Sequence, residues 1–274
     1  MQEFQCTCPG ECCTRIRGMI SKEEMDFLKE YAYGKLPLVQ LISVEETSFP
    51  LWDWEAKRFN EWQKEVNIDA AIKPSRAIYD LSRNLTIIVT YCMDYDRCPF
   101  LSGDGKCRIY KKKRAYVCRM YPFQRSPFLK IEQPPIPTNL LGTCPVTDKI
   151  ITLMPTDFDE MIKFFYRYFK TDSAFYNIVQ NDIIIEWVNK TIVELCRKKI
   201  ILPAMNYPYK YLLRRIENSK KIDLTEFLVS EKVHSKFDMD KKIGEFDNNL
   251  NAKDKIENYL NSIGYNRELK IIDS

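Results

Sequence analysis

Nine of the ten cysteines in this 274-residue chain lie between Cys6 and Cys144, and this placement constrains the fold more than any other feature. Only Cys196 lies further along. A disulfide framework is the ordinary alternative, but it suits small secreted domains that cannot build a core, and this chain is long and 45% hydrophobic. Thiols gathered in one half of a core-forming chain favour a metal centre held by thiolates.

Other features of the sequence limit where the protein can be located and which catalytic or metal-binding residues it can use. The N-terminus has no apolar segment of the secretory type, and no apolar run approaches the roughly 18–20 residues of a membrane span. We therefore expect a cytoplasmic protein without a membrane partner. His234 is the only histidine, which argues against histidine-based nucleophiles and against two-histidine metal sites. We expect His234 to lie at the surface.

The hydrophobic patterns predict an α+β fold that is mostly helical. Helices are expected from Ser21 to Gly34 and from about Asp53 to Ile72, and the β-branched run Leu85–Tyr91 is the clearest strand. The stretch from Asp96 to Cys144 is expected to form loops and short elements, because prolines prevent long helices at Pro122, Pro127, Pro134, Pro135 and Pro137. Helical patterns then recur at 156–168, 172–200, 209–216, 224–229 and 254–263.

These patterns suggest two domains. Residues 1–150 form a loop-rich, metal-binding cysteine domain with a short sheet, and residues 151–274 form an all-helical C-terminal region. Cys196 shares an apolar helical stripe with Val188 and Ile192, so we expect it in the core and not at the metal.

The candidate ligands fall into two groups. The first is a box of four thiols within eight residues, in which Pro9-Gly10 favours a turn that lets them converge. The second arrives singly in Cys98-Pro-Phe-Leu101, Gly105-Lys-Cys107-Arg-Ile-Tyr110, Cys118-Arg-Met-Tyr-Pro122 and Cys144. The predicted metal ligands are therefore Cys6, Cys8, Cys12, Cys13, Cys98, Cys107, Cys118 and Cys144.

These motifs, in this order, resemble the CxxCxxCC cysteine-cluster family of zinc- or iron-chelating domain proteins, which includes the flagellin lysine-N-methylases. The resemblance covers roughly residues 6–145 and implies that Arg114 and Arg119 are the basic residues beside the bound cofactor. Three positions and one spacing depart from the family pattern. Cys8 stands one residue early, Ala115 replaces a proline, and Tyr121 replaces a phenylalanine. The spacing between Cys107 and Cys118 is longer than in the family by one residue.

Thiolate ligation suits an iron–sulfur cluster or zinc and excludes magnesium and calcium. Ligands that arrive singly from separate loops favour a cluster, most simply [4Fe–4S], with zinc as the alternative. Residues 92–123 carry eight basic and three acidic side chains, and this excess of positive charge would offset the negative charge of a thiolate cluster. The run Lys111–Arg114 is interpreted as charge compensation, or else as a docking patch for nucleic acid or an acidic protein.

Three hypotheses for function remain open. In the first, the centre supports modification of a protein substrate, and the resemblance implies that this modification is lysine methylation. In the second, it is a zinc staple in a non-catalytic interaction module. In the third, it is a metal carrier or a redox sensor. S-adenosylmethionine would need an unconventional site, because radical-type Cys-x3-Cys-x2-Cys and glycine-rich GxGxG motifs are absent. A protein partner or substrate is favoured over nucleic acid.

Overall fold

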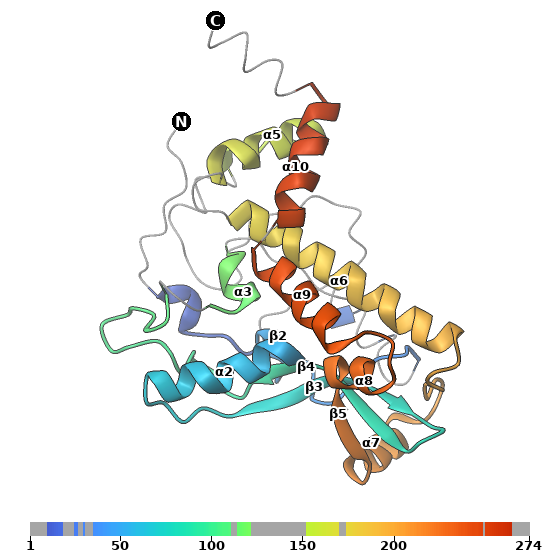
Figure 1. Cartoon of the computed structure of the whole chain (residues 1–274). Coiled ribbons are helices and arrows are strands. Elements are labelled where there is room, and N and C mark those ends of the chain that lie inside the picture. Colours follow the sequence, from blue (N-terminus) through green and yellow to red (C-terminus); the bar gives the residue numbers. More distant parts are fainter. Residues whose placement is uncertain are drawn as a thin grey trace, which may run out of the picture.

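The structure is a computed structural model, and it describes residues 10–18, 25–26, 30, 35–110, 114–121, 152–169, 174–248 and 250–264. A small sheet lies at one end of a set of helices, and the long helix α6 (Ala174–Arg197) runs diagonally above it (Figure 1). The predicted α+β class with a helical C-terminal region is confirmed.

The sheet is built on a long antiparallel hairpin. Strands β3 (Ile72–Asp80) and β4 (Leu85–Met93) pair along their whole length, and the chain turns between them where Asn84 adopts a φ of 50°. Short strands β1 (Val39–Gln40) and β2 (Pro50–Trp52) flank this hairpin in the order β1-β3-β4-β2. The predicted strand at 85–91 is confirmed.

Helix α2 (Asp53–Glu65) begins at the predicted residue but ends seven residues before the predicted end. The chain leaves the helix at Asn67, whose φ of 52° lies in the left-handed region, and then enters β3. The expected helix between Ser21 and Gly34 lies largely outside the described residues, which record helix only at 25–26 and 30.

The C-terminal half is helical with one exception. Besides α6, its helices are α5 (Phe158–Phe169), α7 (Tyr209–Glu217), α8 (Leu224–Ser230), α9 (Lys236–Asn248) and α10 (Leu250–Ser262). The exception is β5 (Lys220–Asp223), which pairs in parallel with β4 from Leu85 to Ile88. The C-terminal half therefore completes the sheet that the N-terminal half begins. The domain boundary near residue 150 stays a prediction.

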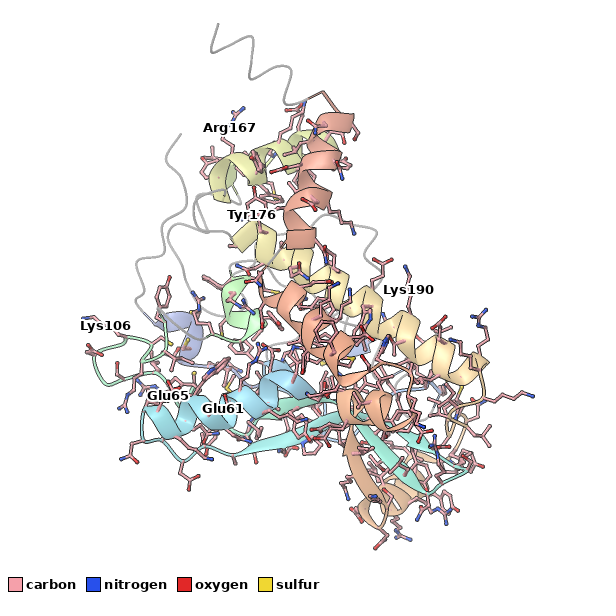
Figure 2. The ribbon with its side chains drawn as sticks, in the orientation of Figure 1. Glu61, Glu65, Lys106, Arg167, Tyr176 and Lys190 are labelled. Atoms are coloured by element: carbon pink, nitrogen blue, oxygen red, sulfur yellow. The ribbon has the colours of Figure 1, made fainter. Side chains whose placement is uncertain are left out.

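Two hydrophobic clusters hold the sheet, the helices and the cysteine loops together. One joins the sheet to α6, α8 and α9 through buried side chains such as Val89, Ile185 and Phe227. The other lies between α2 and the cysteine loops and includes Phe59, Trp62 and Phe100. Charged side chains such as Lys106 and Lys190 lie at the periphery (Figure 2).

None of the described helices combines the length and the apolar character that crossing a membrane requires.

Candidate metal centre

The first wall of the centre is the 3-10 helix η1 (Glu11–Cys13). Its turn is closed by a hydrogen bond from Cys13 N–H to Gly10 O (2.9 Å). Gly10 has a φ of +75°, and a Cβ there would lie 2.1 Å from Gly105 O. Only glycine allows both this backbone conformation and this close approach to the neighbouring loop. The turn predicted at Pro9-Gly10 is thus present at its described residue.

The second wall is the loop that carries Cys98 and Cys107. Cys98 N–H donates to Cys13 O (2.8 Å), which joins this loop to η1. Leu101 and Cys107 form an antiparallel bridge, so the two cysteines of the loop are brought near each other. Phe100 is buried and meets Phe59 of α2 edge to face, at 5.0 Å between ring centroids. The loop is therefore fixed to the core beneath it.

The third wall is the short helix α3 (Tyr116–Arg119), which carries Cys118. Ala115, immediately before it, is buried and accepts a hydrogen bond from Cys118 N–H (3.0 Å). Alanine at the position where the family pattern has proline thus packs into the same cluster as Phe59 and Phe100.

Five thiols converge between these walls, and all of them pack against one hydrophobic cluster. Cys12 Sγ lies 3.8 Å from Cys13 Sγ. Cys13 also hydrogen-bonds Cys98 and interacts electrostatically with Cys107. Cys118 interacts in the same way with Cys13, Cys107 and Cys12. The N-terminal segment thus meets two segments of the second cysteine group, more than 80 residues further along the chain, through their thiols.

Crowding and burial raise the pKa values of Cys12, Cys13 and Cys118. The hydrogen bond to Cys13 and burial raise the pKa of Cys12. For Cys13, the bond with Cys12 lowers the pKa, but the bond with Cys98, burial and its thiol neighbours outweigh it and raise the pKa to about 12. Burial and neighbouring thiols raise the pKa of Cys118. A buried set of thiols that resists ionisation needs a cation before it can become a set of thiolates.

One positive side chain already acts on the thiols. Arg114 lowers the pKa of Cys12 and of Cys118 through its charge, and it donates a hydrogen bond to Cys118 O. Its guanidinium also stacks over the Tyr110 ring at 4.5 Å. Arg119 points elsewhere, over the Tyr116 ring (4.2 Å) and towards Asp247. Of the two predicted cofactor-binding arginines, the structure brings Arg114 to the thiols and not Arg119.

The predicted ligand set is therefore partly visible. Cys12, Cys13, Cys98, Cys107 and Cys118 lie together, whereas Cys6, Cys8 and Cys144 lie outside the described residues, as do Lys111–Lys113. Within the described ranges, no group of three or more His, Cys, Asp or Glu side chains is already arranged to hold a metal ion. None of the seven described cysteines forms a disulfide.

The donor set fits a thiophilic metal in its chemistry. Sulfur is the ligand that zinc and iron–sulfur clusters prefer, and hard cations avoid it. Cys12, Cys13, Cys98, Cys107 and Cys118 are the described residues that would hold the group.

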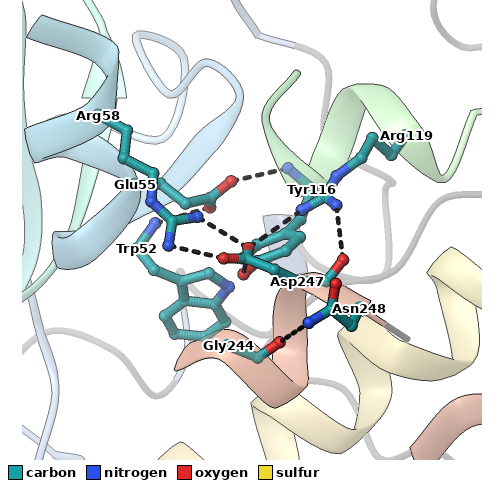
Figure 3. A network of polar contacts seen from close by, with 8 residues as sticks. All are labelled: Trp52, Glu55, Arg58, Tyr116, Arg119, Gly244, Asp247 and Asn248. Carbon is teal, nitrogen blue, oxygen red and sulfur yellow. Dashed lines mark hydrogen bonds and ion pairs between the residues drawn. The ribbon is translucent and has the colours of Figure 1, made fainter. Parts of the chain in front are cut away.

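A network around one buried and one partly buried carboxylate, which the sequence analysis missed, holds α3 in place (Figure 3). Glu55 of α2 is only 2% exposed, and it accepts hydrogen bonds from Tyr116 N–H (2.7 Å) and from Trp52 N–H (3.1 Å). Tyr116 OH donates to Asp247 Oδ1 (2.6 Å). Arg58 binds both oxygens of Asp247 at 2.7 Å. Cys118 therefore sits on a helix that is tied to α2 and α9.

This network predicts a pH dependence of stability. Burial, opposed by the hydrogen bonds from Tyr116 and Trp52, raises the pKa of Glu55 from its ordinary 4.5 to about 7. The folded state then binds a proton more tightly than the unfolded state, so this contribution to stability is complete below pH 4.5 and is lost as pH rises to 7. Over that window we expect Glu55 to reduce the free energy of unfolding by about 3 kcal/mol.

Urea denaturation of the wild type and of Glu55→Gln at pH 4.5, 6 and 7 measures this effect. The variant cannot ionise at this position, so the difference in stability between the two proteins should change across the window. A difference that stays constant from pH 4.5 to 7 would show that folding does not raise the pKa of Glu55.

Two residues, Cys196 and His234, were predicted to lie away from the metal centre, in the core and at the surface respectively. Cys196 is half-buried and packs against the cluster that contains Val188 and Ile192, away from the other described thiols. His234 is half-buried and not fully at the surface, because its ring lies 6.3 Å from that of Trp187.

The fold and the converging thiols define a cysteine-rich domain on an α+β scaffold. Residues 5–135 match the family CxxCxxCC, described as "Putative zinc- or iron-chelating domain". The match confirms the resemblance seen in the motifs. Comparisons with curated proteins and with solved structures gave no match.

Proposed function

We propose that the chain binds an iron–sulfur cluster through thiolates of its cysteine-rich half. The observation that carries the proposal is the convergence of five thiols from three separate segments on one hydrophobic cluster. A bound cluster would supply either one-electron chemistry or a rigid link between these segments. Cys13 interacts with thiols on η1, on the loop and on α3.

The electrostatics support a negatively charged group at this place. Four thiolates around a [4Fe–4S] core of charge +2 leave a net charge of −2. Arg114 already favours the ionised form of two of the thiols, and Lys106 and Arg108 flank Cys107 in the sequence. A cationic surrounding stabilises such a cluster and raises its reduction potential.

Zinc is the second candidate, and one distance favours it. Two sulfurs bound to one tetrahedral zinc at about 2.3 Å lie about 3.8 Å apart. Cys12 Sγ and Cys13 Sγ show this separation. On this alternative the thiols would form a structural staple without redox chemistry.

Anaerobic purification from cells supplied with both iron and zinc separates the two candidates. The iron–sulfur proposal expects a brown protein that absorbs broadly near 400 nm and contains iron with acid-labile sulfide in similar amounts. A colourless protein with stoichiometric zinc would reject the cluster in favour of the staple.

Methylation of a protein lysine, and any S-adenosylmethionine site, stay predictions from the resemblance. They depend on regions beyond the thiols, and no contact in the described residues supports them.

A further inference from the structure

A second surface, remote from the thiols, combines exposed aromatic rings with clustered positive charge. Large hydrophobic side chains are exposed at seven described positions, and four of these fall within residues 202–211: Leu202, Met205, Tyr207 and Tyr211. This segment leads into α7, which lies at the bottom of the molecule in Figure 1, well separated in that view from α3 and η1. The thiol centre does not account for it.

The two tyrosines form a platform. Tyr207 and Tyr211 are 37% and 49% exposed, and their rings stack with an interplanar angle of 14° and 6.1 Å between centroids. Tyr207 lies just before α7, and Tyr211 lies in the first turn of that helix. The guanidinium of Arg215 extends this row, 6.0 Å from the Tyr211 ring, and its Nε donates to Tyr79 OH (3.2 Å). Planar groups are thus held in series at the surface.

The same stretch of chain is rich in exposed positive charge. Lys210, Arg214 and Arg215 are exposed on α7, Lys220 is exposed at the start of β5, and Glu217 is the one acidic residue between 207 and 221. In the part of the chain that the structure describes, no carboxylate forms an ion pair with Lys210, Arg214 or Lys220. We define Tyr207, Lys210, Tyr211, Arg214, Arg215 and Lys220 as the α7 surface.

Local structural roles explain only part of this surface. Arg214 and Arg215 lie in the last turn of α7, where cations interact favourably with the helix dipole. Lys220 is on β5, which pairs only with β4 among the described strands, and lysines protect exposed sheet edges. Neither role requires two exposed tyrosines stacked beside these charges. Exposed aromatic rings grouped beside cations form a candidate contact surface for a ligand.

We propose that the α7 surface binds single-stranded nucleic acid. Bases stack on exposed aromatic rings and on guanidinium planes, and the phosphates that follow them need neighbouring Lys and Arg side chains. The stacked Tyr207–Tyr211 pair with Arg215 offers a stacking surface for bases. The phosphates can be bound by Lys210, Arg214 and Lys220. An acidic protein would use the charges but would leave the flat rings without partners. The proposal is independent of the proposed metal centre.

Fluorescence anisotropy with a labelled 15-nucleotide oligo(U), at 50 and 200 mM salt, tests the proposal on the full-length protein. The wild type should bind, and binding should weaken with salt. Tyr207→Ala/Tyr211→Ala should weaken binding about tenfold or more, because bases lose their stacking surface. Lys210→Gln/Arg214→Gln should weaken binding and reduce the salt slope by about 1.4, which corresponds to two phosphate contacts.

Matched changes elsewhere provide the controls. Phe237→Ala removes an aromatic side chain that is 75% exposed on α9, and Lys190→Gln removes an exposed charge on α6; both should bind oligo(U) like the wild type. Tyr211→Phe keeps a ring and should retain binding. Circular dichroism verifies that the variants fold.

Two results would overturn the proposal. The first is no binding of oligo(U) at 50 mM salt. The second is binding that the tyrosine changes leave intact, together with equally tight binding of poly-glutamate, which would assign the surface to acidic proteins.

Discussion

Replacing Cys118 with Ser is expected to abolish stoichiometric metal binding. Cys118 is the only described thiol on α3 and faces thiols of both other segments, so its loss removes one wall of the centre. Where loops carry the ligands, metal binding and folding are coupled, and a structural metal contributes on the order of 10 kcal/mol. We therefore expect the free energy of unfolding to fall by several kcal/mol, together with the loss of metal measured by elemental analysis.

Cys196→Ser is the matched control. It makes the same chemical change at a half-buried cysteine on α6 that no other described thiol approaches, and it should leave the metal content unchanged. Cys98→Ser and Cys107→Ser should behave like Cys118→Ser. Equal metal loss in Cys196→Ser and Cys118→Ser would mean that the metal is bound somewhere other than between these three segments.

Gly10→Ala, which changes no ligand, is expected to have the second largest effect. A Cβ at this residue would lie 2.1 Å from Gly105 O and 2.6 Å from Leu101 Cδ1, on a backbone with a φ of +75°. The positive φ alone costs about 1 kcal/mol for alanine, and the clash with a backbone oxygen must move η1 away from the Cys98–Cys107 loop. We expect metal affinity to fall at least tenfold in a competition titration with a chelator.

Gly103→Ala tests whether the effect is specific. Gly103 lies in the same loop, and a Cβ there would meet no atom within 4 Å, so metal affinity should stay within twofold of the wild type. Wild-type affinity in Gly10→Ala would show that contact between η1 and the loop is unnecessary for the centre.

Local sequence patterns predicted the helices and strands whose hydrophobic residues follow the regular period of the element. The β-branched run of β4 and the apolar stripes of α5 and α6 are obvious because one face of each element is buried. Strand β3 was missed because Pro74 and Arg76 look wrong for a central strand. The structure accommodates them with an irregular register between Pro74 and Ala77, and with a hydrogen bond from Arg76 Nε to Gln40 Oε1 (3.1 Å).

Strand β5 and helix α9 were missed for a similar reason. The residues of β5 begin with two exposed lysines, and their pairing with β4 depends on a partner more than 130 residues away. Helix α9 presents a weak apolar stripe, in which Met239 and Phe246 are the buried residues. The pairing of β5 with β4 leaves no periodicity in a short window of sequence, and the few buried residues of α9 leave only a weak one.

The residues of the candidate site also fall into those that sequence patterns identify and those that only the fold reveals. The cysteines were identified from spacing, because thiol ligands need a particular residue type in a particular order. The carboxylate network was not, since Glu55 reads as an ordinary first-turn acid of α2 and only the fold shows that it is buried against Tyr116 N–H. The resemblance implies that Arg119 lies beside the cofactor, and this stays a prediction. In the structure its guanidinium lies over the Tyr116 ring and near Asp247, a placement that spacing alone does not indicate.

X-ray absorption at the edge of the bound metal, on protein purified without oxygen, tests the central claim most directly. If thiolates of the described segments hold the metal, its first shell should contain only sulfur, at about 2.3 Å. The Cys118→Ser protein should lose this signal, and Cys196→Ser should keep it. A first shell of nitrogen or oxygen, or a sulfur shell that survives Cys118→Ser unchanged, would contradict the assignment of these thiols to a metal centre.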